Sequence, residues 1–79
     1  MKLSPRQAEV LGELAAGETL RDIRSYYVRA GRLKYIHYNT FISLRKRKLI
    51  EYKGRDEDGY TDLYTITPAG IAAVKEGKK

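Results

Sequence analysis

Hydrophobic residues recur at helical spacing in the first part of the chain, between Ala8 and Ala15. Ser4 and Gln7 form a capping box that would start a helix, and Gly17 supplies a left-handed stop at its end. The pattern therefore predicts a helix over Pro5–Ala16.

A second helical pattern follows after a short break. Thr19 is a typical N-cap residue, and apolar residues recur at helical spacing from Leu20 to Tyr27. Gly31 is placed to end this segment. We therefore expect a second helix from about Leu20 to Ala30.

The third helical segment is clearer at its end than at its start. Phe41 and Leu44 lie on one side of a helical wheel drawn over Tyr35–Lys48, and His37 is expected to pack beside them. The pattern predicts a helix over these residues. An alternative start at an Asn39 cap would shorten the helix and leave the residues before it in a loop.

The period changes from 3.6 to 2 after Leu49. Apolar and polar residues alternate over residues 50–53, a turn-forming segment covers residues 54–59, and the alternation resumes over Leu63–Thr67. This pattern predicts a β-hairpin. Pro68 then follows a threonine cap and starts a short C-terminal helix.

The net positive charge is concentrated in the middle of the chain. The sequence has 79 residues and a net charge of +6, and it corresponds to a single domain, residues 1–79, that we expect to be ordered from about residue 3 to residue 76. Nine Lys or Arg lie between Leu20 and Lys48, where Asp22 is the only acid. Such a distribution is typical of a surface that faces phosphates.

The composition speaks against catalysis. The chain has one histidine and no cysteine, so zinc ligation, thiol catalysis and a histidine-dependent triad all lack residues. We expect no catalytic residue, metal, cofactor or small-molecule ligand. No apolar run approaches the ~20 residues that cross a bilayer. The lack of cysteine fits a reducing compartment, so we expect a cytoplasmic protein.

Two segments resemble a known family. Leu44–Glu51 (LRKRKLIE) resembles the end of the recognition helix and the first wing strand of MarR, PadR and ArsR-like regulators. Leu63–Gly70 (LYTITPAG) resembles their second wing strand and the following helix. With the order of the expected elements, the resemblance extends over nearly the whole chain. It implies an α+β winged helix-turn-helix domain, with three helices, a two-stranded hairpin wing and a short C-terminal helix. Lys48 stands where those families usually have glycine.

The resemblance implies binding of double-stranded DNA by a small transcriptional regulator, with the third helix in the major groove and the second helix across the backbone. The outward side of the third helix carries side-chain types that contact bases. The candidates for base readout are Tyr35, Tyr38, Asn39, Ser43, Arg45 and Lys46. The candidates for phosphate contacts are Arg21, Arg24, Arg29, Arg32, Lys34 and Arg47.

The expected wing has an unusual charge, because its tip carries Arg55 beside three acids, Asp56, Glu57 and Asp58. Arg55 is the wing residue expected to reach a groove. The acids are expected either to keep an exposed turn hydrated or to hold a partner protein.

The sequence is also compatible with a second copy of the chain, another protein or a single-stranded nucleic acid as partner. We expect a weak homodimer through the first helix or through the terminal helix around Ile71 and Val74, because one small domain reads too few base pairs to select a site. A protein-interaction domain within a larger assembly is the first alternative. A binder of single-stranded nucleic acid or RNA is the second, with exposed tyrosines as stacking platforms: Tyr26, Tyr35, Tyr38 and Tyr60.

Overall fold

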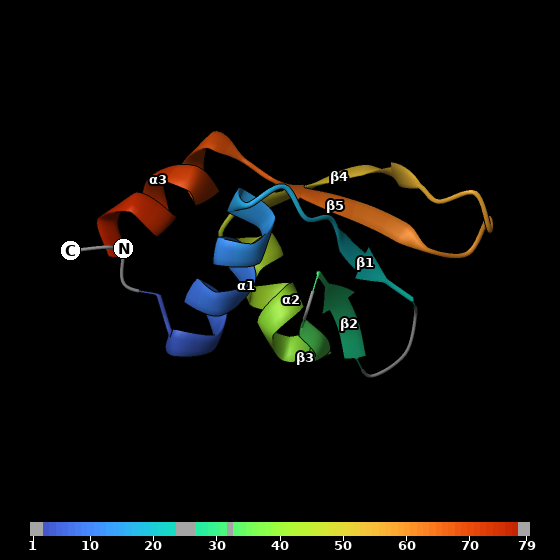
Figure 1. The fold of residues 1–79 in the computed structure, drawn as a ribbon, viewed down its shortest axis with the longest axis horizontal. Coiled ribbons are helices and arrows are strands. Elements are labelled where there is room, and N and C mark those ends of the chain that lie inside the picture. Colours follow the sequence, from blue (N-terminus) through green and yellow to red (C-terminus); the bar gives the residue numbers. More distant parts are fainter. Residues whose placement is uncertain (1–2, 24–26, 32, 78–79) are drawn as a thin grey trace.

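Five strands and three helices make up the described part of the chain (Figure 1). The computed structural model describes residues 3–23, 27–31 and 33–77. Its elements in chain order are α1 (Pro5–Ala15), β1 (Leu20–Asp22), β2 (Tyr27–Ala30), β3 (Leu33–His37), α2 (Tyr38–Lys46), β4 (Ile50–Arg55), β5 (Asp62–Ile66) and α3 (Pro68–Gly77). The strands form one antiparallel sheet in the order β3-β2-β1-β5-β4. The β4–β5 hairpin extends well beyond the helices in Figure 1.

One face of the sheet is covered and the other is open. The covered face carries Leu20, Ala30 and Tyr64, which are buried in a single cluster with apolar residues of α1, α2 and α3. The cluster consists of Val10, Leu11, Leu14, Leu20, Val28, Ala30, Ile36, Phe41, Leu44, Leu49, Ile50, Tyr64 and Ala73. The residues that alternate with the buried strand positions are exposed or half-buried. We refer to their side of the sheet as the open face.

The α+β class is confirmed, whereas the winged helix-turn-helix architecture is wrong. The predicted architecture has three helices followed by a two-stranded wing. The structure instead has a five-stranded sheet, with three strands between α1 and α2. The predicted helix over Leu20–Ala30 is replaced by β1 and β2. In the part of the chain that the structure describes, α2 is preceded by strands, so a helix-turn-helix motif is absent there.

Side-chain types explain why strands form in this region. Val28 and Ile36 are paired across β2 and β3, and both are fully buried. Ala30 is buried and Arg29 is exposed, which is the period of two of a half-buried strand. Gly31, expected to end a helix, instead has a φ of 54° and lies in the turn between the two strands. Helical and strand periods are hard to separate in such short apolar runs.

The third predicted helix begins later than expected. Tyr35 and Ile36 lie in β3, and α2 covers Tyr38–Lys46. His37 is exposed rather than packed, and its Nδ1 accepts a hydrogen bond of 3.0 Å from the backbone N–H of Asn39. This histidine is therefore the N-cap of α2. The alternative prediction, an N-cap at Asn39, is wrong by two residues.

The two ends of the chain fold as expected. The capping box between Ser4 and Gln7 is present, and α1 ends at Ala15, one residue before the predicted end. Gly17 has a φ of 105°, and its N–H donates to the carbonyl of Leu14. The predicted hairpin strands are present as β4 and β5, but they form the outer pair of the larger sheet. The last helix, α3, starts at Pro68.

Lys48 closes α2 in a left-handed conformation. Its φ is 58°, and it is the only described residue besides glycines with a positive φ. The Lys48 N–H donates to Arg45, and the Leu49 N–H donates to Leu44, each at 3.0 Å. This is a Schellman motif with lysine at the position that glycine usually takes. The Lys48 carbonyl also accepts a 2.8 Å bond from the Thr67 hydroxyl, which joins this turn to the start of α3.

Candidate nucleic-acid interface

The sheet divides the predicted basic surface into two parts. Leu20 and Asp22 are buried on the covered face, so Arg21 between them points to the open face. Arg29 is its direct partner on β2 and shares that face. The helix α2 packs on the covered face. The charge distribution suggested a single continuous basic surface. The structure has two, because Arg21 and Arg29 lie on the open face and the basic residues of α2 lie on the covered side of the sheet.

The exposed side of α2 carries polar and basic residues. Asn39 and Lys46 are exposed and lie seven residues apart, which places them on one side of the helix. Arg45 lies at the flank nearest the β4–β5 hairpin, because its guanidinium contacts Tyr64 of β5. Half-buried Tyr38 also faces the core on this flank. Of the six base-readout candidates, Asn39 and Lys46 therefore share the exposed side of α2, and Tyr38 and Arg45 share its flank.

Arg45 is held by two aromatic rings. Its guanidinium carbon lies 5.5 Å from the centre of the Phe41 ring and 5.4 Å from that of Tyr64. The two rings meet edge to face, with their centres 4.9 Å apart. Burial raises the pKa of Tyr64, and the nearby positive charge of Arg45 opposes that shift. These contacts fix the direction of the Arg45 side chain, although the residue itself remains exposed.

This arrangement was not predictable from the sequence, because Tyr64 is distant from Arg45 along the chain. One half of it was visible, since Phe41 and Arg45 are four residues apart on a helix and such pairs are neighbours. The other half depends on the position of β5 against α2.

Ser43, a further base-readout candidate, lies on the side of α2 that contacts α1. Its hydroxyl accepts a 2.7 Å hydrogen bond from Nε2 of the buried Gln7 and donates a 2.9 Å bond to the Thr40 carbonyl. The Gln7 side chain also bonds the backbone of Ser4 in the capping box. The Ser43 hydroxyl is thus engaged in helix packing. Its role in packing was not visible from sequence spacing.

Four consecutive cations lie at the C-terminal end of α2: Arg45, Lys46, Arg47 and Lys48. All four are exposed. The left-handed turn at Lys48 changes the chain direction immediately after them. Positive side chains are also favourable beside the negative end of a helix dipole. This basic cluster, residues 45–48, is the strongest concentration of charge next to the exposed side of α2.

The hairpin tip has internal partners for its charges. The Arg21 guanidinium meets the Asp56 carboxylate at 2.6 Å, and Arg55 meets Asp62 at 3.5 Å. The Asp58 carboxylate accepts bonds from the Thr61 hydroxyl and from the backbone N–H groups of Tyr60 and Thr61. These hydrogen bonds, that of the Thr61 side chain first, lower the pKa of Asp58 from 3.8 to about 2. Asp56 and Asp58 therefore stabilise the hairpin turn through an ion pair and hydrogen bonds, in addition to being hydrated.

The remaining candidates are separate from α2 or lie outside the described residues. Tyr35 is 72% exposed on β3, and its backbone carbonyl accepts a bond from Arg6. Tyr60, at the hairpin tip, is 76% exposed. Candidates outside the described residues are Arg24, Tyr26 and Arg32, and the side chain of Lys34 likewise lies outside what the structure describes.

Comparisons of this chain with protein-family models, with curated proteins and with solved structures return no match. Among the residues that the structure describes, none of the helices is long and apolar enough to cross a membrane.

Proposed function

We propose that this chain binds double-stranded DNA through α2 and acts as a small transcriptional regulator. The observation that carries the proposal is the surface of α2, where Asn39 and Lys46 lie on the exposed side and Arg45 lies on the flank beside the Phe41 and Tyr64 rings. In the major groove, amide side chains pair with adenine and cationic side chains pair with guanine. A groove of this kind admits one α-helix, and Asn39, Arg45 and Lys46 of α2 are exposed.

The basic cluster supports the phosphate part of the contact. Arg47 and Lys48 directly follow the last residue of α2, Lys46, and both are exposed. Cations at this position would neutralise the phosphates that flank the groove. Arg21 and Arg29 point to the other side of the sheet, so the proposal does not assign them to the same duplex.

Site selection in this proposal requires a second copy of the chain. The apolar residue Ile71 on α3 is 41% exposed, whereas Val74 packs against the core. A weak homodimer through α3 or α1 would place two copies of α2 on half-sites about one helical turn apart. Sedimentation of the chain with a palindromic duplex checks this, and one copy per duplex on every palindrome would contradict it.

Selection of bound sequences from a random duplex library tests the function. We expect enrichment of a short motif and a loss of that enrichment in Asn39→Ala, because an unpaired base edge relaxes specificity. A chain that prefers unpaired probes would be a single-strand binder instead. A chain that retains no duplex in this selection would favour the protein-interaction alternative. A cytoplasmic location remains a prediction within this proposal.

A further inference from the structure

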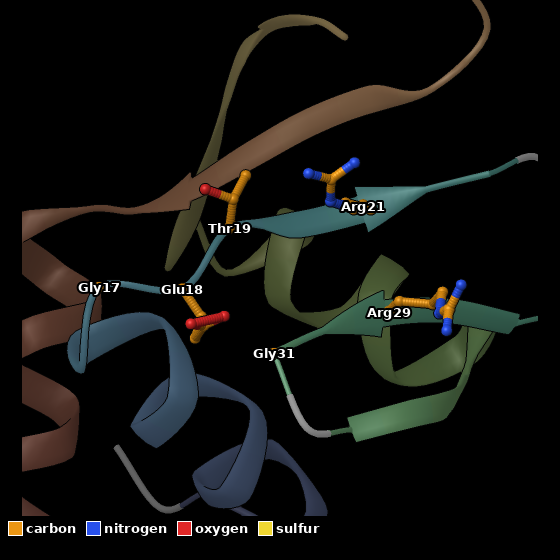
Figure 2. A pocket seen from close by; sticks show the side chains of 6 residues that line it. All are labelled: Gly17, Glu18, Thr19, Arg21, Arg29 and Gly31. Atoms are coloured by element: carbon orange, nitrogen blue, oxygen red, sulfur yellow. The ribbon is translucent and has the colours of Figure 1, made fainter. Parts of the chain in front are cut away.

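A polar pocket opens where the α1–β1 loop meets β1 and β2 (Figure 2). Its volume is about 390 Å³. It is lined by Gly17, Glu18, Thr19, Arg21, Arg29 and Gly31. Both arginines belong to the open face, so the pocket is separated from α2 by the sheet.

The two arginines are neighbouring like charges, of which Arg21 has an acidic partner. Arg21 and Arg29 are directly opposite one another in the antiparallel pairing of β1 and β2. Side chains at such positions have Cβ atoms about 5 Å apart, and like charges there destabilise the sheet. Asp56 neutralises Arg21 at 2.6 Å. Within the described part of the chain, Arg29 has neither an ion pair nor a side-chain hydrogen bond.

The acid in the lining, Glu18, is directed toward Gly31 and away from Arg21. A Cβ atom at Gly31 would lie 2.7 Å from Cγ and 2.9 Å from Oε2 of Glu18, so this side chain lies against the Gly31 backbone. In Figure 2 the Glu18 carboxylate turns toward Gly31, whereas Thr19 and Arg21 point to the other side of the chain. Thr19 and Arg21 are two residues apart, as neighbours on one face of an extended segment are.

We propose that this pocket binds a phosphate group. Arg21 and Arg29 supply the two positive charges, and the Thr19 hydroxyl supplies a hydrogen-bond donor. Guanidinium groups suit this ligand, because their paired N–H donors match the spacing of phosphate oxygens. The site goes beyond the proposed function, since its two arginines lie on the open face and α2 packs on the covered face.

Asp56 makes the proposal testable by a gain of binding. Its carboxylate occupies the Arg21 guanidinium and therefore competes with phosphate for it. Asp56→Asn removes the competing charge and should tighten phosphate binding about threefold or more, whereas Arg29→Gln should weaken it about tenfold. A purely structural role for the Arg21–Asp56 pair does not produce tighter binding.

The experiment is a titration of the ¹⁵N-labelled chain, followed by amide chemical shifts at constant ionic strength. The probes are inorganic phosphate, thymidine 5′-monophosphate and a short single-stranded oligothymidylate, with chloride as the reference anion. We expect saturable shifts at Thr19, Arg21 and Arg29 with each phosphate probe. Lys75→Gln is the matched control, because it removes one exposed cation on α3 and should leave the affinity unchanged.

The probes also identify the source of the phosphate. Tightest binding of the oligonucleotide assigns the pocket to a polynucleotide backbone, and equal binding of all three assigns it to the phosphate group alone. Shifts that chloride reproduces would overturn the proposal, as would equal weakening by Lys75→Gln and Arg29→Gln. The native chain is titrated with a duplex in parallel. Duplex binding without a phosphate response refutes the pocket alone, and the reverse result refutes the α2 proposal alone.

Discussion

Arg45 lies over the ring of Tyr64, with its guanidinium carbon 5.4 Å from the ring centre. This contact joins α2 to the β4–β5 hairpin and fixes the direction of Arg45, which we assign to base contacts. Lysine in its place would keep the charge but lose the planar group that stacks and forms paired hydrogen bonds.

We therefore expect Arg45→Lys to weaken binding to the selected duplex by about 1 to 3 kcal/mol while random duplex binds almost as before. Fluorescence anisotropy with both duplexes measures the difference. Lys75→Arg on α3 is the control for a change of cation type far from α2. Equal losses on the selected and random duplexes would reassign Arg45 to phosphate contacts.

Substitution of Ser43 should lower the stability of the fold, whereas substitution of Asn39 should lower the affinity for specific duplex. Ser43→Ala leaves Nε2 of the buried Gln7 without its partner, so we expect a loss of about 1 to 2 kcal/mol in the free energy of unfolding. Its affinity for duplex should be unchanged. Asn39→Ala should instead lower specific duplex affinity and leave stability nearly constant, since its side chain is exposed.

Urea unfolding and anisotropy of both variants separate packing from readout. A Ser43→Ala variant with native stability and impaired duplex binding would restore Ser43 as a base contact.

The left-handed conformation of Lys48 predicts a stabilising substitution. Lys48→Gly removes the steric strain at a φ of 58°, and we expect the free energy of unfolding to rise by about 1 kcal/mol. Lys48→Ala is the matched control, because it removes the same charge and keeps the strain. Urea midpoints that are equal for the glycine and alanine variants would show that the strain is negligible.

Asp58 predicts how the hairpin responds to acid. Its pKa is lowered to about 2 in the folded chain, so the carboxylate stabilises the fold above its ordinary pKa of 3.8 and loses that effect as the pH falls toward 2. Asp58→Asn should lower the melting temperature at neutral pH and should flatten its decline over this acidic range. Glu57→Gln, which removes a neighbouring charge at an exposed site, should keep the native decline. Parallel curves for Asp58→Asn and the native chain would contradict this role.

Local rules predicted the ends of the chain well. The capping box of Ser4 and Gln7 and the left-handed stop at Gly17 depend on residues within one turn, and they form as expected. The alternation before and after the hairpin turn likewise depends on near neighbours. Gly31 was recognised as a break, although the elements on either side of it were assigned the wrong type.

The middle of the chain depends on contacts that the sequence does not contain locally. Val28 and Ile36 are buried as strand partners, and Leu20 is buried because β1 pairs with β5, more than forty residues later. The same reason explains the candidate site. The charges of residues 20–48 were correctly located in the sequence, but strand alternation sends Arg21 to the open face while α2 lies on the other.

The salt dependence of duplex affinity tests the central claim, that α2 and the basic cluster contact a duplex, most directly. Each phosphate neutralised contributes about −0.9 to the slope of log affinity against log salt, so the two cations assigned to phosphates, Arg47 and Lys48, predict a slope of about −2. Lys48→Gln should make the slope shallower by about one, whereas Arg29→Gln on the open face should leave it unchanged. Anisotropy over a series of salt concentrations gives these slopes. A flat slope for the native chain, or an equal change in both variants, would contradict the proposed interface.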